Sequence, residues 1–275
     1  MYVSLNNTLT PGKMEWPEFA RLAAKTGYGG VDLNLSAAMK EGLAATRALL
    51  SDLKLKASCC GVPVAATGGE DAFRQSMETL DEAARFASAV GCPRMTFIMP
   101  AASDTPKEEL WRTLRTRFIA VGDVLARHNV RLGFEFRASY QVRSAGPYEF
   151  IWRMNDMLQF AAECGSHMGL LLDSWHWYRA GASLDDIRKA GKARIVTVHV
   201  SDSAKVTSPS TRDDTRLLAG EGVIDLVGFL RALKEIGYED GVSPEPVGRI
   251  PQEMSPELGA RQGLLTTLAV LNLAE

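Results

Sequence analysis

Histidine and cysteine are scarce in this chain of 275 residues, which contains only four of each. The cysteines, Cys59, Cys60, Cys92 and Cys164, include no C-x-x-C pair, the spacing typical of zinc sites and dithiol redox motifs. Cys59 and Cys60 are adjacent in a predicted strand, so their side chains point to opposite faces and are poor disulfide partners. We therefore expect buried free thiols in a reducing cytoplasm.

The chain also lacks an excess of positive charge and any long apolar segment. Its formal net charge is −2, whereas a protein that binds DNA or RNA normally carries a basic stripe. No apolar run reaches the ~20 residues of a membrane span. The first residues, MYVSLNNTLTPGK, have neither the basic start nor the apolar centre of a secretory signal. These absences predict a cytoplasmic protein with no nucleic-acid partner and no membrane association.

Short apolar stretches alternate with segments of helical periodicity along the whole chain, without a linker or a low-complexity segment. The predicted strands are residues 2–5, 31–35, 55–60, 95–99, 131–136, 169–173, 195–200 and 241–245. The predicted helices are residues 15–25, a helix reaching residue 53, 71–90, 106–128, 147–164, 183–190, 223–236 and 257–273. Parallel strands need crossover connections, so this alternation predicts a parallel sheet covered by helices.

Four successive predicted strands end on residues that can bind a metal ion or transfer a proton. These are Glu135 in LGFEFR, Asp173 in GLLLDSWH, His199 in IVTVHVSD and Glu245 in GVSPEP. Active sites of (β/α)8 barrels lie at the carboxyl ends of the strands. No G-x-G-x-x-G follows the first strand, as an open doubly wound sheet would favour. We therefore predict an α/β fold, a single (β/α)8 TIM barrel over residues 1–275.

The same four residues predict a metal site. One imidazole and three carboxylates suit a divalent ion such as Mn, Mg, Co or Zn. Without an ion the clustered carboxylates would repel one another, and one would take up a proton. Singly, each residue has a structural explanation: the aspartate could cap a helix, the histidine could be buried and satisfied, and Glu245 could be a surface charge between two prolines. The repetition on four strands favours the metal site.

At these residues the chain resembles the xylose-isomerase-like barrel superfamily of sugar phosphate isomerases and epimerases. It is most similar to the ketose 3-epimerase, inosose dehydratase and hydroxypyruvate isomerase branches. The resemblance implies that Glu135, Asp173, His199 and Glu245 bind one divalent metal ion, with manganese favoured. It also implies that Glu135 and Glu245 are the catalytic proton carriers.

The resemblance extends to substrate-binding residues. The family's D-x-x-H pattern corresponds to residues 173–176 and places His176 near the substrate. Its arginine before a Gly-Glu-Gly turn corresponds to Arg216 in RLLAGEG, which implies a contact to substrate oxygens; Arg212 is the weaker alternative. Arg137 is either a pocket cation or part of an outer ion pair. Trp175 either stacks on a sugar or packs in the core.

The chain departs from the related abasic-site endonucleases, which use three zinc ions and additional histidines after the second and third strands. Here the third and fourth predicted strands lead into CCGVP and FIMP, without histidine. The resemblance therefore implies a single metal ion and a small carbohydrate or polyol substrate rather than DNA.

The expected chemistry is proton transfer beside a carbonyl group. A divalent ion that binds the carbonyl oxygen can stabilise the developing negative charge by several kcal/mol. Return of the proton gives epimerisation or isomerisation, whereas loss of a β-substituent gives a lyase; a barrel that only binds its ligand is a third alternative. The polar stretch 203–222 is a predicted lid or a solvated loop. Association into homo-oligomers stays open.

Overall fold

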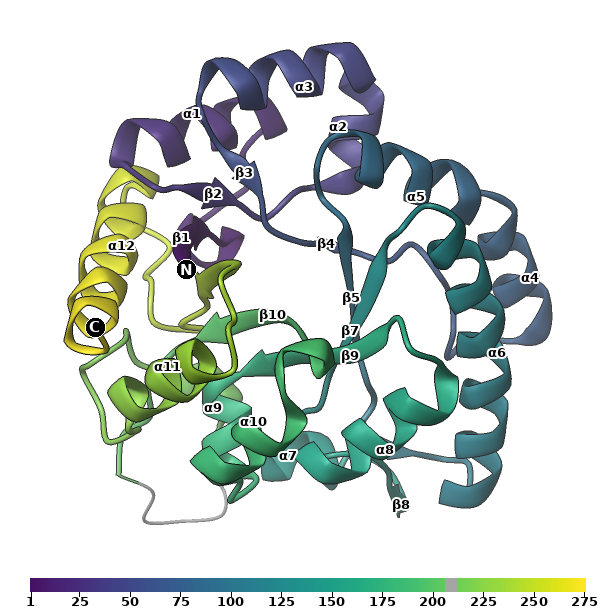
Figure 1. Cartoon of the computed structure of the whole chain (residues 1–275). Helices are drawn as coiled ribbons and strands as arrows, with labels where there is room; N and C mark the ends of the chain where they lie inside the picture. Colours follow the sequence, from purple (N-terminus) through teal and green to yellow (C-terminus); the bar gives the residue numbers. More distant parts are fainter. Residues whose placement is uncertain (206–211) are drawn as a thin grey trace.

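A ring of parallel strands lies inside a ring of helices (Figure 1). The computed structural model describes residues 1–205 and 212–275. The central strands are β1 (Tyr2–Leu5), β2 (Gly30–Val31), β3 (Lys56–Ala57), β4 (Cys60–Gly61), β5 (Arg94–Ile98), β7 (Arg131–Glu135), β9 (Met168–Asp173), β10 (Ile195–Val200) and β11 (Gly241–Pro244). They are hydrogen-bonded in the order β3-β2-β1-β11-β10-β9-β7-β5-β4. The predicted TIM-barrel fold is confirmed.

Two short strands occupy the third strand position of the barrel. β3 pairs with β2, whereas β4 pairs with β5 on the other side. Only Ser58 and Cys59 separate the two halves, so one extended segment joins the first and the last strand of the hydrogen-bonded order. The predicted strand 55–60 therefore has the right place, but it changes its pairing partner midway.

The helices follow the strands and form the outer layer. They are α1 (Trp16–Thr26), α2 (Leu35–Glu41), α3 (Leu43–Asp52), α4 (Glu70–Glu78), α5 (Leu80–Ala89), α6 (Lys107–Arg127), α7 (Tyr140–Arg143), α8 (Met154–Cys164), α9 (Ser174–Arg179), α10 (Leu184–Ala190), α11 (Leu226–Glu235) and α12 (Pro256–Leu273). α12 packs beside α1, so the last helix completes the outer ring next to the first (Figure 1). In the part of the chain that is described, no helix combines the length and apolar character needed to cross a membrane.

Several predicted boundaries are wrong. The predicted helix reaching residue 53 is two helices, because Gly42 at φ 89° interrupts it. The predicted helix 71–90 is broken at Thr79. The predicted strand 31–35 ends early, since Asn34 accepts a hydrogen bond from the Ala37 N–H and caps α2. The start of the predicted helix 147–164 instead contains β8 (Tyr148–Glu149), which pairs with β6 (Ala102–Ser103).

Alternation along β7 explains how a carboxylate reaches the barrel interior. Phe134 points outward and packs edge-on against Phe118 of α6 and Phe160 of α8, with ring centroids 4.7 and 5.5 Å apart. Neighbouring residues of a strand point to opposite faces, so Gly133 and Glu135 face inward. A Cβ at Gly133 would lie 2.8 Å from the backbone nitrogen of Leu171, so only glycine fits there. The aromatic outer face thus fixes Glu135 on the inner one.

Three arginines lie at the amino end of the barrel strands and donate hydrogen bonds to other segments. Arg94 forms an ion pair with Asp240, which precedes β11, and donates to the Ser58 carbonyl oxygen at 3.3 Å. Arg131 donates to the carbonyl oxygens of Ala193 and Ile195. Arg194 donates to the carbonyl oxygens of Gly165 and Met168, at 3.3 and 3.0 Å. The guanidinium groups at this end therefore satisfy main-chain carbonyl oxygens of several strands and of the segments that precede them.

Candidate metal centre and adjoining cavity

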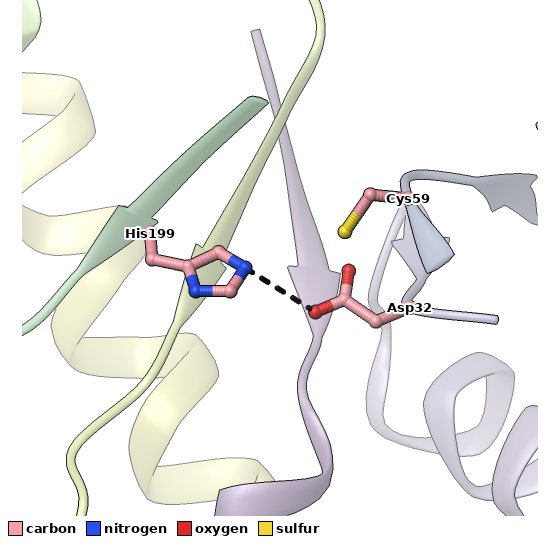
Figure 2. A group of neighbouring side chains, drawn as sticks. All are labelled: Asp32, Cys59 and His199. Carbon is pink, nitrogen blue, oxygen red and sulfur yellow. Dashed lines mark ion pairs between the residues drawn. The ribbon is translucent and has the colours of Figure 1, made fainter. Parts of the chain in front are cut away.

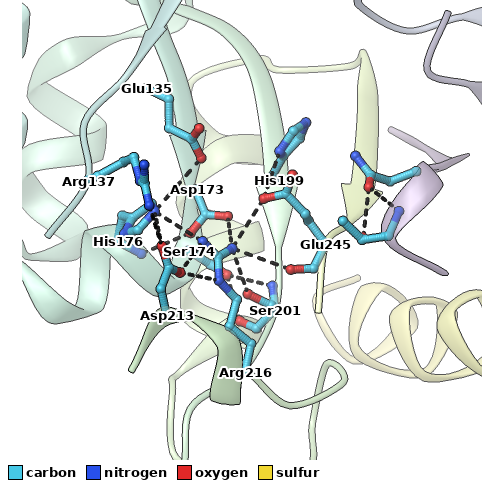
Figure 3. A network of polar contacts seen from close by, with 12 residues as sticks. Glu135, Arg137, Asp173, Ser174, His176, His199, Ser201, Asp213, Arg216 and Glu245 are labelled. Atoms are coloured by element: carbon cyan, nitrogen blue, oxygen red, sulfur yellow. Dashed lines mark hydrogen bonds and ion pairs between the residues drawn. The ribbon is translucent and has the colours of Figure 1, made fainter. Parts of the chain in front are cut away.

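Four strand ends bring the predicted ligands together at the carboxyl end of the barrel (Figure 3). Glu135 and Asp173 are the last residues of β7 and β9, His199 lies near the end of β10, and Glu245 follows β11 directly. One ligand atom from each of the four lies within 4.8 Å of the others. Glu135, Asp173 and His199 are buried, with exposed fractions of 5%, 1% and 6%. The four residues form a candidate buried metal site.

The register of the strands explains this convergence. His199 is paired with Asp173 across β10 and β9, and with Ser243 across β10 and β11. The Glu245 N–H continues the ladder by donating to the Val200 carbonyl oxygen at 2.8 Å. Adjacent strands in register therefore end at one level, and their terminal side chains share one small volume.

Burial and mutual repulsion perturb the acids of the cluster. Burial, together with the charges of Glu245 and Asp173, raises the pKa of Glu135 to about 8. Burial would also raise the pKa of Glu245, but the charges of His199 and Arg216 outweigh it and lower the pKa to about 2. The two glutamates therefore differ at neutral pH: Glu135 holds a proton and Glu245 is ionised. This is the response expected of clustered carboxylates without a cation.

The buried polar atoms test whether a metal ion fits this site. Glu135 Oε1 and both ring nitrogens of His199 have no hydrogen-bond partner among residues 1–205 and 212–275. An unsatisfied buried polar group costs ~1–3 kcal/mol, and a cation would satisfy Glu135 Oε1 and the one unprotonated nitrogen of His199. One imidazole nitrogen with carboxylate oxygens suits Mn, Co or Zn, and carboxylates also suit Mg. The residues present therefore fit a divalent ion.

Arg216 lies in the middle of the acidic cluster and is almost completely buried. Its guanidinium group donates to Asp173 Oδ2 at 2.9 Å and to Glu245 Oε2 at 3.2 Å. It also forms an ion pair with Asp213 at 2.7 Å. Its observed contacts are thus with two of the predicted ligands; a contact to substrate oxygens stays a prediction. The alternative, Arg212, is exposed and pairs with Asp214.

His176 lies beside the cluster with a defined orientation. Its Nδ1 lies 3.2 Å from the backbone nitrogen of Ala138, and its Nε2 faces the guanidinium group of Arg216. Both neighbours are N–H donors, and a neutral imidazole accepts at one nitrogen only, so only one of the two can be a hydrogen bond to the neutral ring. Nε2 lies 3.0 Å from Arg216 Nη2, 3.8 Å from Asp213 Oδ2 and 4.0 Å from Glu135 Oε1. Burial and the charge of Arg216 lower the pKa of His176 to about 4. The ring is therefore neutral at pH 7.

Asp173 connects the cluster to the following helix. Its Oδ1 accepts the His176 N–H at 2.9 Å and so caps α9, while its Oδ2 faces Arg216. The structural and the functional interpretation of this aspartate therefore apply together. The short helix α9, which the sequence analysis did not predict, begins at this cap and carries His176.

The other predicted residues lie around the cluster. Arg137 forms an ion pair with Asp213 at 3.3 Å, the outer ion pair considered above. Trp175 is completely buried; Arg216 lies 5.2 Å above its ring, and His176 packs edge-on against it. Trp175 thus supports two other side chains, and its contact to a sugar stays a prediction. Asp213 was missed because it lies outside any strand.

The predicted lid, residues 203–222, is described only in part, since residues 206–211 lie outside the described chain. Hydrogen bonds to one carboxylate hold the two ends of this stretch together. The Asp202 carboxylate accepts backbone N–H groups of Ser203, Gly220, Gly222 and Ile224 at 2.8–3.1 Å. The role of this stretch as a lid stays a prediction.

The sequence analysis also missed a second group of ligand-type residues on the other side of His199. Asp32, Cys59 and His199 each offer an atom within 4.8 Å of the others (Figure 2). Asp32 directly follows β2 and Cys59 lies between β3 and β4. The rule that identified Glu135 also applies to Asp32, a polar residue at the carboxyl end of a barrel strand. The predicted free thiols are confirmed: all four cysteines are unpaired and buried.

A cavity of about 550 Å³ adjoins this second group. The loops after β1, β2 and β3 supply most of its walls, with Asn6, Lys13, Trp16, Asp32 and Asn34, and His199 lines it from β10. The cavity has room for a small molecule and contacts the metal cluster through one shared imidazole. Its walls carry neutral and charged polar groups as well as an indole.

The comparisons with known proteins agree with this architecture. A curated inosose isomerase from Bacillus licheniformis is 35% identical over 106 residues, which are 38% of this chain and 38% of that protein. The chain thus matches well under half the length of that relative. A solved xylose isomerase domain protein from Alicyclobacillus acidocaldarius is 28% identical, with a TM-score of 0.90, and the match covers 99% of this chain and 98% of that one.

A crystal structure of the IOLI protein with a bound zinc atom shares the fold, with a TM-score of 0.82 at 19% identity over 99% of this chain and 98% of that one. The family model for the xylose isomerase-like TIM barrel matches residues 20–268. The match extends over most of the chain and includes all four strand ends of the cluster. The protein therefore belongs to the xylose isomerase-like TIM barrel family.

Proposed function

We propose that this protein is a divalent-metal-dependent isomerase or epimerase of a small keto sugar or keto polyol. The observation that carries the proposal is the convergence of three carboxylates and one imidazole at the ends of β7, β9, β10 and β11, next to a cavity of about 550 Å³. The similarity to an inosose isomerase favours a cyclic keto polyol among these substrates. Manganese is the expected ion, and the zinc in the IOLI structure makes zinc the first alternative.

Glu135 and Glu245 are the proposed proton carriers. When bound, the metal ion supplies positive charge next to the oxygen on which negative charge develops as the neighbouring carbon loses its proton. Their surroundings already differ in the metal-free protein, where the pKa of Glu135 is raised to about 8 and that of Glu245 is lowered to about 2. Two carboxylates in such different surroundings can divide proton removal and proton return between them.

Arg216 and His176 orient the acids and the substrate. Arg216 holds Asp173 and Glu245 in fixed directions through two hydrogen bonds, and so limits the rotamers of both carboxylates. His176 Nε2 lies 4.0 Å from Glu135 Oε1 and 3.8 Å from Asp213 Oδ2, where the ring can form a hydrogen bond with a substrate oxygen. Because Arg216, His176 and Asp173 are buried, water competes little with these interactions.

Hydrogen exchange at carbon tests the proposal. Purified protein, depleted of metal and then loaded with Mn²⁺ or Zn²⁺, is incubated in D2O with inososes and with ketoses. We expect deuterium at the carbon beside the carbonyl, in a product of otherwise unchanged mass. Loss of water or of an alcohol would instead support a lyase that expels a β-substituent from the same carbanion. No exchange with any substrate of either group would contradict both.

A further inference from the structure

The cavity side of His199 is formed by an aspartate that the proposed reaction does not use. Asp32 Oδ2 lies 3.9 Å from His199 Nε2 (Figure 2), while Nδ1 of the same ring lies 3.4 Å from Glu245 Oε2. The two ring nitrogens therefore face different groups: Nδ1 faces the candidate metal cluster, and Nε2 faces Asp32. The ring is buried, and neither nitrogen has a hydrogen-bond partner in the described chain.

The carboxylate of Asp32 is held in a fixed position. Its Oδ1 accepts hydrogen bonds from the hydroxyl groups of Ser4, at 3.2 Å, and Ser243, at 2.8 Å. Its Oδ2 accepts one from the Asn6 side-chain amide at 2.9 Å. These donors come from β1, the segment after it, and β11, so three separate positions hold the group. Oδ2, with a single donor, retains acceptor capacity toward His199.

We propose that Asp32 is a positioning residue for the metal centre: its carboxylate keeps the proton of neutral His199 on Nε2 and thereby presents Nδ1 as a lone-pair donor to the cation. This inference rests on the proposed metal-dependent function. Neutral imidazole has one N–H donor and one acceptor nitrogen, so an acceptor on one side of the ring selects the opposite nitrogen as ligand. Metal-binding histidines generally have such an outer partner, often a carboxylate.

The alternative is a second cation held by Asp32, Cys59 and His199. With one cation already on Nδ1, a second on Nε2 would require the ring to lose both of its protons. In addition, three hydrogen bonds already occupy the Asp32 carboxylate. These two points favour the positioning role.

Cation affinity tests the role of Asp32 separately from turnover. The metal-free full chain is titrated with Zn²⁺ and with Mn²⁺ by calorimetry, for the wild type, Asp32→Ala and Asp32→Asn. We expect one cation per chain and an affinity lower by ~10–100-fold in both variants, the usual effect of removing an outer-shell partner. Asparagine should not rescue, because its amide NH₂ would oppose the donors Ser4, Asn6 or Ser243. Lys13→Ala, at another wall of the cavity, should bind as the wild type does.

Unchanged affinity in both Asp32 variants would overturn the positioning role while leaving the proposed function intact. Loading with cobalt tests the second site, because a thiolate bound to cobalt has an absorption band. A second bound cation with this band, lost in Cys59→Ser, would overturn the positioning role in favour of a second site. Failure of the wild type to bind any cation would contradict the proposed function itself.

A measurement on the wild type keeps the test valid if the Asp32 variants do not fold. In the long-range ¹H–¹⁵N spectrum of the zinc-loaded chain, His199 should show a slowly exchanging proton on Nε2 and zinc on Nδ1. The chain has only four histidines, and His199→Gln identifies the signal by its loss. Zinc on Nε2 would overturn the proposal.

Discussion

At the amino end of the barrel, three arginines donate to main-chain carbonyl oxygens, whereas at the carboxyl end three carboxylates and an imidazole surround one arginine. The side chains of Arg94, Arg131 and Arg194 donate to main-chain carbonyl oxygens of other segments of the barrel. At the opposite end, Glu135 Oε1 and both nitrogens of His199 have no hydrogen-bond partner in the described residues. The arginine side chains at one end therefore have partners within the fold, and the other end has groups that a ligand would satisfy.

This difference separates stability from activity. Buried polar groups with partners stabilise a fold, whereas buried groups without partners destabilise it and are retained for function. Substitutions at the amino end should therefore destabilise the barrel without changing its chemistry. Substitutions at the carboxyl end should abolish the chemistry and leave the barrel folded.

The largest effect is expected from the two glutamates. Glu135→Gln and Glu245→Gln should each lower turnover by ~10²–10⁴-fold, because each removes one positioned proton carrier. Circular dichroism and thermal unfolding should show that the fold is retained. Glu163→Gln, on the outer helix α8, is the matched control and should keep wild-type turnover. A variant at either site that turns over like the wild type refutes the catalytic assignment of that glutamate.

His199→Ala should reduce cation binding. Loss of the ligand should weaken affinity by at least the ~10–100-fold typical of outer-shell changes. Metal content after dialysis provides the measurement. His167, at the amino end before β9, offers the comparison: His167→Ala should retain the cation. Equal occupancy in both variants would count against His199 as a ligand.

The free energy of unfolding of the metal-free protein should depend on pH because of Glu135. Its pKa rises from 4.5 to about 8 on folding, so the folded state binds more protons between these values. The resulting stabilisation is complete below pH 4.5 and is lost as the pH rises through about 8. Unfolding by urea from pH 5 to pH 9 should show this loss in the wild type but not in Glu135→Gln. Parallel pH profiles for the two proteins would contradict the raised pKa.

The smallest effect belongs to the amino end. Arg94→Met should lower the free energy of unfolding by ~2 kcal/mol, because it leaves the partly buried Asp240 and the Ser58 carbonyl without their donor. Turnover of the folded protein should not change. Arg212→Ala, which removes an exposed ion pair with Asp214, should cost less than ~0.5 kcal/mol. A loss of turnover in folded Arg94→Met would contradict the view that the amino end contributes to stability and not to activity.

Local patterns predicted the strands well, and helix breaks less well. β1 and β10 have the predicted boundaries, because each is a short segment rich in apolar residues that is followed by a polar residue. The breaks at Gly42 and Thr79 were missed, since helical periodicity continues across both residues. α9 was missed because its capping residue, Asp173, ends the preceding strand without an intervening loop.

The sequence predicted the four converging residues but not their partners. Glu135 and His199 were identifiable because each ends a strand, and parallel strands in register bring their ends together. Asp213 and Cys59 lie outside the strands and acquire their positions only through the folded loops. Arg216 was identified by the resemblance to the family, yet its contacts with Asp173 and Glu245 depend on a tertiary arrangement that no local pattern encodes.

The dual engagement of Asp173 restricts what evolution can place at this position. One oxygen initiates α9 and the other faces Arg216. Glutamate would preserve the charge, but its longer side chain is a poor helix initiator; asparagine would initiate the helix but lose the anion. The cap of α9 and the negative charge beside Arg216 therefore require the same short acid.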